Sequence, residues 1–69
     1  MNKVYIVMHQ IPYEGSDLIS VHATKESAMK RIKVESEESY GSYKLDSLGE
    51  QCENKWDCRY YIVEQYVVD

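Results

Sequence analysis

The run RYYIVEQYVV, residues 59–68, is the segment of the chain most prone to form a β-strand, because β-branched and aromatic side chains dominate it. It lies near the end of a chain of 69 residues. A chain of this length forms one domain and buries only roughly 60% of its unfolded surface, which leaves little room for a deep active-site cleft. We therefore predict a single domain, residues 1–69, whose last strand is residues 59–68.

Two further strand-like runs open the chain. KVYIVMHQ, residues 3–10, and DLISVHA, residues 17–23, are separated by a turn that contains Pro12 and Gly15. A hairpin of these runs places six apolar side chains on one face: Val4, Ile6, Met8, Ile19, Val21 and Ala23. The other face then carries Tyr5, Val7, His9, Leu18, Ser20 and His22.

A helix is predicted after the hairpin. Thr24 is a favourable N-cap, residues 25–38 are mostly helix formers, and Gly41 ends the helical region. The buried stripe of this helix is narrow and consists of Ala28, Met29, Ile32 and Ser36. We expect the stripe to pack on the hairpin face that carries Ile6, so that the two form one core.

These elements predict an α+β domain of ββαβ topology. A crossover through the helix places the last strand beside the first, which gives a three-stranded, mainly antiparallel sheet of order 2-1-3 with the helix on one face. Residues 41–57 show no sustained period and form a long irregular insertion before the last strand.

The second face of this sheet is expected to be apolar. Glu64 argues against burial of its side of the last strand, because an unpaired buried carboxylate is costly. The uncovered face would then hold Tyr5, Val7, Leu18, Tyr60, Ile62, Tyr66 and Val68, which is too apolar to stand entirely in water. Three covers are open: the insertion with Leu48 and Trp56, another subunit, or a target protein.

Charge is unevenly distributed along the chain. The formal net charge is −4, and residues 35–57 alone hold seven acidic and two basic side chains, a net −5. Such a segment disfavours nucleic acid, whose phosphates require Lys and Arg, and permits a basic protein partner. Neither a membrane-spanning run nor a signal peptide is evident, so we expect a cytoplasmic protein without membrane contact.

The stretch CENKWDC, residues 52–58, raises the question of a metal or redox site. Five residues separate Cys52 from Cys58, which matches neither zinc-ligand spacing nor the redox motif Cys-x-x-Cys. In the predicted hairpin His22 lies opposite Tyr5, about 13 Å along the strands from His9, too far for a shared metal ion. We expect no metal, no cofactor and no catalytic site, with both thiols dispensable and Trp56 as the apolar anchor of the loop.

The residues resemble a class of short uncharacterised proteins of bacteria and their phages. The resemblance rests on KVYIV followed by His9, on the TKESAMKRI helix start and on the closing YIVEQY, about two thirds of the chain. It does not cover residues 41–57, which are longer and more acidic than the pattern. The class carries no activity to transfer; the resemblance implies the ββαβ fold and a phage or mobile-element setting.

Two functions are therefore weighed. The first is a non-enzymatic protein-binding module, either a monomer or a homodimer. It would inhibit or modulate a host protein with a basic surface. Defence nucleases and their complexes are one target class, which would make the activity an anti-defence one such as anti-CRISPR. Its expected partner-binding residues are Glu37, Glu38, Tyr40, Tyr43, Glu50, Glu53, Trp56 and Asp57. The alternative interpretation of this acidic segment is a solvated loop without a binding role. The alternative function is a small-ligand or metal-binding domain that uses Cys52, Cys58 and a histidine.

Overall fold

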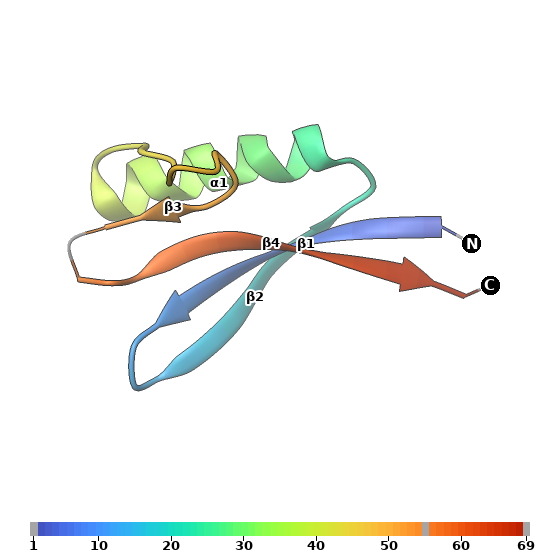
Figure 1. The fold of residues 1–69 in the computed structure, drawn as a ribbon, viewed down its shortest axis with the longest axis horizontal. Coiled ribbons are helices and arrows are strands. Elements are labelled where there is room, and N and C mark those ends of the chain that lie inside the picture. Colours follow the sequence, from blue (N-terminus) through green and yellow to red (C-terminus); the bar gives the residue numbers. More distant parts are fainter. Residues whose placement is uncertain (1, 55, 69) are drawn as a thin grey trace.

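The computed structural model describes residues 2–54 and 56–68 and has the predicted α+β class. Its elements are β1 (Asn2–Ile11), β2 (Gly15–His22), α1 (Lys25–Tyr40), β3 (Cys52–Glu53) and β4 (Arg59–Val67). The sheet order is β2-β1-β4-β3, and α1 lies across one face of the sheet (Figure 1). The last long strand is therefore beside the first, as predicted. The sheet has four strands rather than three because the end of the insertion pairs with β4.

The β1–β2 hairpin follows the predicted register over half its length. Tyr5 lies opposite His22 and Ile6 opposite Val21, as expected, but the register shifts between Val7 and Met8. Beyond that point Met8 pairs with Leu18, so that Ile19 is the extra residue of a β-bulge. The bulge lets Ile19 pack against the core and places Leu18 on the opposite face from Val7.

Both ends of α1 are capped by the residues that the sequence indicates. The Thr24 hydroxyl accepts a hydrogen bond from the Ser27 amide at 3.2 Å. Gly41 has φ +74°, and its amide donates to the carbonyl of Glu37 at 3.1 Å, which is an αL cap that glycine forms without steric cost. The helix thus extends two residues beyond the predicted end at 38.

The core lies on the face of the sheet opposite to the one predicted. The helix contributes the expected stripe, with Ala28, Ile32 and Ser36 fully buried and Met29 packed beside them. From the sheet, however, the fully buried side chains are Val7, Tyr60 and Cys52, with Tyr5, Ile19 and Ile62 packed against them. The expected core residues Val4, Ile6, Met8 and Val21 face away from α1, and Ala23 is exposed.

The expectation that the Glu64 side of the last strand stays outside the core was wrong, because the Glu64 carboxylate is not itself buried. Glu64 shares the α1 side of the sheet with Tyr60 and Ile62, but its side chain is half exposed and pairs with Lys3 Nζ at 3.3 Å. Figure 1 shows β1 and β4 continuing beyond the first turn of α1, so this part of the face meets water. One strand face can therefore be core at one end and solvated at the other.

The insertion is more ordered than predicted, and its anchors differ. Leu48 and Trp56 remain 76% and 69% exposed, whereas Tyr43 and Cys52 pack against the core. The carboxylate of Asp46 accepts hydrogen bonds from the Leu48 and Glu50 amides and from the Gln51 side chain, at 2.8 to 3.2 Å. Of the three covers left open for the sheet face that carries Val7 and Tyr60, the one formed by Leu48 and Trp56 is therefore wrong, because α1 covers this face.

This core assignment predicts the effect of truncating a buried helix residue. Ile32→Ala should lower the free energy of unfolding by roughly 2 to 4 kcal/mol, because it leaves a cavity between α1 and the sheet. Val34→Ala, on the exposed side of the same helix, is the matched control and should cost less than about 0.5 kcal/mol. Urea denaturation followed by circular dichroism measures both, and equal losses would contradict the assignment.

Candidate functional site

The turn between β3 and β4 presents the only tryptophan of the chain. The side-chain oxygen of Asn54 accepts hydrogen bonds from the amides of Trp56 and Cys58 at 3.0 and 3.1 Å. The Asn54 amide also donates to the Cys58 carbonyl at 3.0 Å, and Asp57 adopts φ +63°. These bonds join Asn54 to Trp56 and Cys58 across the turn. The backbone of Trp56 is thus tied to Asn54, while its indole is 69% exposed.

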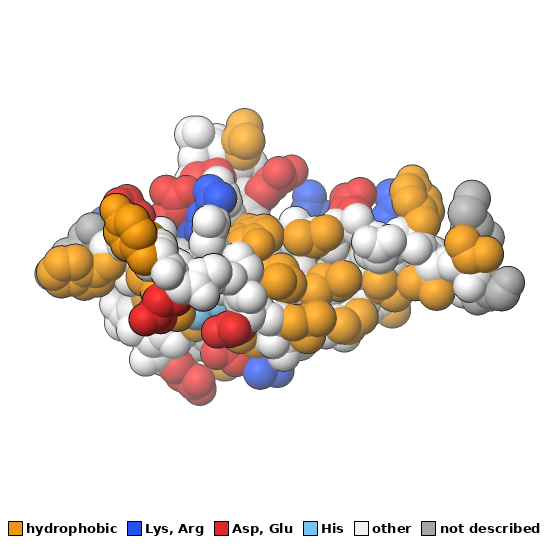
Figure 2. Space-filling model, turned by 90° about the horizontal axis from the view of Figure 1, so that it is seen from below, with side chains coloured by type: hydrophobic (Ala, Val, Ile, Leu, Met, Phe, Trp, Pro, Cys, Tyr) orange, Lys and Arg blue, Asp and Glu red, His pale blue; other side chains and the backbone are white. Residues whose placement is uncertain are grey.

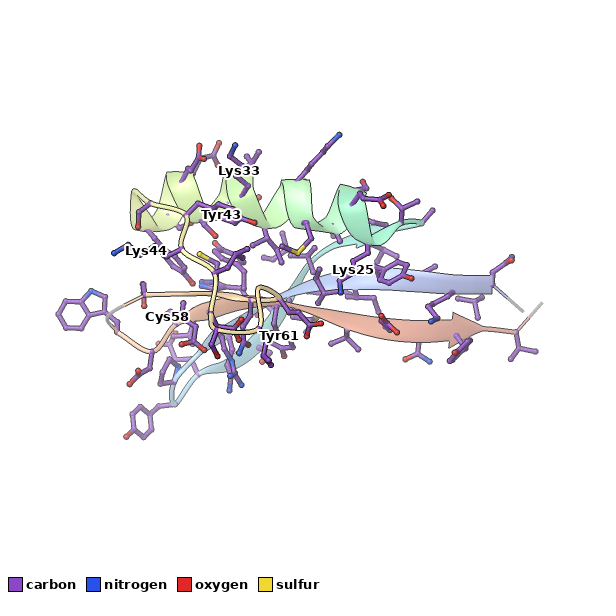
Figure 3. The ribbon with its side chains drawn as sticks, turned by 45° about the horizontal axis from the view of Figure 1, so that its top comes forward. Lys25, Lys33, Tyr43, Lys44, Cys58 and Tyr61 are labelled. Carbon is purple, nitrogen blue, oxygen red and sulfur yellow. The ribbon has the colours of Figure 1, made fainter. Side chains whose placement is uncertain are left out.

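A cavity of about 360 Å³ lies beside this turn, between the C-terminal end of α1 and β3. Figure 3 shows Lys44 and Cys58 at this same end of the molecule, whereas Lys25 lies toward the other end of α1. The lining combines hydroxyls, one carboxylate, one ammonium group and an indole, contributed by Ser39, Tyr40, Ser42, Lys44, Glu53 and Trp56.

The structure brings some of the predicted partner-binding residues together and separates others. Tyr40, Glu53 and Trp56 line the same cavity, and Asp57 lines an adjoining one of about 280 Å³ that also includes Glu53. Glu37 and Glu38 are exposed near the end of α1. We call this region the acidic end: the last turns of α1 with Glu37 and Glu38, Glu53 of β3, and the β3–β4 turn with Trp56 and Asp57.

Two predicted residues do not belong to the acidic end. Glu50 lies in the turn that follows Asp46, and its carboxylate pairs with Lys25 Nζ at 3.4 Å, near the start of α1. Tyr43 is partly buried and packs against the core. Tyr40 also differs from the expectation, because its ring is partly buried and reaches the cavity only at one side.

Sequence reasoning missed a cluster of three rings beneath the acidic end. His9 and Tyr60 pair across β1 and β4 and stack with ring centroids 4.2 Å apart. His9 Nε2 lies 3.0 Å from the Tyr40 hydroxyl, and the Tyr60 hydroxyl lies 2.9 Å from that of Ser39. His9 was expected on the sheet surface. The predicted pairing of the first strand with the last could have indicated that His9 and Tyr60 are neighbours. The cluster was missed because the helix was expected to cover the other face of the sheet.

Burial sets the protonation states within this ring cluster. Burial lowers the pKa of His9 below its ordinary value, partly opposed by the charges of Asp17 and Glu35. Burial also raises the pKa of the Tyr40 phenol well above its usual range, with the neighbouring Tyr60 adding to the effect. A neutral imidazole and a protonated phenol can form one hydrogen bond between Nε2 of His9 and the Tyr40 hydroxyl, and the tautomer of His9 sets which of the two donates.

The two cysteines have different environments. Both are free thiols, with Cys52 fully buried in the core and Cys58 partly exposed in the β3–β4 turn. The expectation that both are dispensable is therefore wrong for Cys52. Within residues 2–54 and 56–68, no group of three or more His, Cys, Asp or Glu side chains is arranged to hold a metal ion. Over the same residues, no helix is long and apolar enough to cross a membrane.

The contrast between the cysteines gives a matched pair of variants. Cys52→Ser should lower the free energy of unfolding by about 1 to 3 kcal/mol, because the core offers the new hydroxyl an apolar site. Cys58→Ser should change it by less than about 0.5 kcal/mol, because that side chain is partly exposed. Urea denaturation under reducing conditions compares the two, and a stable Cys52→Ser protein would place Cys52 outside the core.

The ring cluster predicts a pH dependence of stability. Because burial lowers the pKa of His9 below the ordinary histidine value of about 6.5, the unfolded chain binds this proton more readily than the folded chain. Stability is therefore complete above about pH 6.5 and falls as the pH drops below that value. His9→Gln should reduce this decline between about pH 7.5 and 5.5, measured as the urea midpoint. An unchanged decline in the variant would exclude His9 as its source.

Comparison with known proteins places the chain in a family without assigning an activity. No curated protein and no solved structure matches it. Residues 2–68 match the family DUF7336, described as a domain of unknown function, and this match spans all five elements of the fold. The chain therefore belongs to the DUF7336 family.

Proposed function

We propose that the protein is a non-enzymatic protein-binding module that recognises a basic protein surface through its acidic end. The observation that carries this proposal is the Trp56 indole, which is 69% exposed although the turn beneath it is fixed by hydrogen bonds. Large aromatic side chains dominate the binding energy of protein interfaces. The hydrogen bonds that tie the backbone of Trp56 and Cys58 to Asn54 would reduce the entropy lost when such an anchor is immobilised in a complex.

The charge around the indole favours a basic partner. Glu53 ends β3 and Asp57 lies in the β3–β4 turn, one before and one after Trp56 in the chain, and Glu37 and Glu38 are exposed on the last turns of α1. Carboxylates of this kind accelerate encounter with a basic surface, and an indole face accepts a Lys or Arg side chain by cation–π attraction. Lys44 is the basic side chain that lines the cavity, so it limits the net negative charge there.

The proposal keeps the partner class expected from the sequence. In it the partner is a basic host protein, including nucleic-acid-binding defence complexes whose phosphate-binding sites the carboxylates would occupy. The protein would then compete with DNA or RNA for that partner. A phage or mobile-element setting belongs to the same proposal and rests on the resemblance of the KVYIV and TKESAMKRI motifs.

The single tryptophan allows a direct test with a defined probe. Titration with an arginine-rich peptide should shift the Trp56 emission to shorter wavelength in a saturable way, because the peptide covers the exposed indole. The apparent affinity should fall as salt is raised from about 0.05 to 0.3 M, because the carboxylates are screened. Glu53→Lys should weaken binding about tenfold or more.

The matched control is Glu50→Lys, which makes the same charge change in the same segment. Glu50 pairs with Lys25, away from the indole, so this variant should alter the affinity less than about threefold. An equal loss in both variants would reduce the effect to net charge and overturn the assignment of the site. No shift of the emission with any basic probe would exclude Trp56 as the anchor.

A further inference from the structure

The face of the sheet that α1 leaves uncovered is an apolar band. We call it the open face: the side chains of β1, β2 and β4 that point away from the helix, which include Val4, Ile6, Met8, Leu18, Val21, Tyr61, Val63 and Val67. Figure 2, seen from below the sheet of Figure 1, shows these hydrophobic side chains as a continuous orange band. Leu18 and Val21 are 59% and 54% exposed, so the band meets water directly.

The open face carries almost no charge. Among its described residues the one charged side chain of β1, β2 and β4 is Arg59, at the border where Glu53 of β3 lies opposite. Arg59 Nε donates to Gln10 at 2.6 Å, and its guanidinium lies 5.6 Å from the centroid of the Tyr61 ring. The protein as a whole has a net charge of −4. Apart from Arg59, the open face therefore offers little attraction to a charged partner and little repulsion to the same face of a second copy.

The molecule exposes more surface than a compact monomer of its mass. Its accessible surface is 4926 Å², whereas about 4,500 Å² is typical of a monomeric protein of 8.1 kDa. Its extents of 40 × 25 × 21 Å show the same elongation. Domains this small often need oligomerisation to complete their core. Covering the open face would add the missing layer on the second side of the sheet.

The size of the open face fits a small, specific dimer. Three strands spaced about 4.8 Å apart and roughly 30 Å long cover a footprint of about 400 Å². Two such footprints amount to about 800 Å², and the side chains that project from both sheets bring the buried area toward the lower limit of about 1,200 Å² for stable specific interfaces. We propose that two copies of this chain pack open face to open face about a two-fold axis.

This arrangement satisfies both the sheet and the charges. Two twisted sheets pack face to face about 10 Å apart with their strands inclined by about 30°, and a two-fold axis sets each residue patch against its own copy. The two helices and both acidic ends then lie on the outside of the dimer. The like charges of the two copies are thus kept apart, and each acidic end stays accessible, so the dimer goes beyond the proposed binding function without depending on it.

Pairing through the β2 edge of the sheet is disfavoured by the same structure, because the bulge at Ile19 interrupts the regular ladder of β2. On the other side β3 has only two residues, and beyond it the turn that contains Leu48 and Glu50 lies against Tyr61 and Ile62 of β4. The rest of β4 is not paired with β3, so pairing through the β4 edge is the competing arrangement, and the variants below distinguish it from face-to-face packing.

Sedimentation equilibrium tests the dimer. The wild-type protein should change from 8.1 kDa to twice that mass as its concentration rises through the micromolar range, and its melting temperature should rise with concentration. Leu18→Glu on β2 and Val63→Glu on β4 should each shift the dissociation constant upward at least tenfold, because each buries a carboxylate in the interface. Both side chains are exposed in one copy, so each variant should keep the circular dichroism spectrum of the wild type.

Val34→Glu is the matched control, because Val34 is also an exposed aliphatic residue but lies on α1, away from the open face. It should dimerise as the wild type does. A wild-type protein that stays at 8.1 kDa up to millimolar concentration overturns the proposal. A dimer that survives both Leu18→Glu and Val63→Glu also overturns it, since the contact would then lie at an edge or on the helix side. If Glu53→Lys loses peptide binding but still dimerises, the result supports the binding role of the acidic end and leaves the dimer proposal unchanged.

Discussion

Tyr60 joins the layers of this domain through one buried ring. Its backbone pairs with His9 of β1 on one side and with Cys52 of β3 on the other, its ring stacks on the imidazole at 4.2 Å, and its hydroxyl meets that of Ser39 of α1 at 2.9 Å. A buried tyrosine is stable only where its hydroxyl finds a partner. With α1 docked on this face of the sheet, Ser39 reaches Tyr60 and supplies that partner, so this contact supports the face of the sheet that becomes core.

That choice of face organises the rest of the molecule. With Tyr60 and Val7 turned toward α1, the aliphatic side chains of the central strands turn outward and form the open face. Because β3 pairs with β4 only at Tyr60 and Arg59, the turn that carries Trp56 projects from the end of the sheet, beside the last turn of α1. The acidic end and the open face are thus two consequences of one docking geometry. They differ in chemistry, one charged with an aromatic anchor and the other uncharged and apolar.

The candidate site was only partly predictable from the sequence. Glu53, Trp56 and Asp57 are neighbours in the chain, so their common location follows from local sequence alone. Glu50 belongs to the same acidic segment, yet its ion pair with Lys25 places it toward the start of α1, because the hydrogen bonds to Asp46 turn the chain back. Tyr43 and Cys52 lie in a segment that shows no periodic pattern in the sequence, but both pack on the core. Long-range pairing, which no local pattern contains, decided each of these cases.

The sequence by itself determined the elements of this protein and their order: strands from β-branched and aromatic runs, a helix capped by Thr24 and Gly41, and the placement of the last strand beside the first. These features depend on local propensity, capping and chain connectivity, which are encoded within short stretches. Only the tertiary structure decided which face of the sheet is buried. Both faces of β1 are apolar, so alternation could not distinguish them, and the choice depended on contacts between residues far apart in the chain: the hydroxyls of Ser39 and Tyr60, and the ion pair of Lys3 with Glu64.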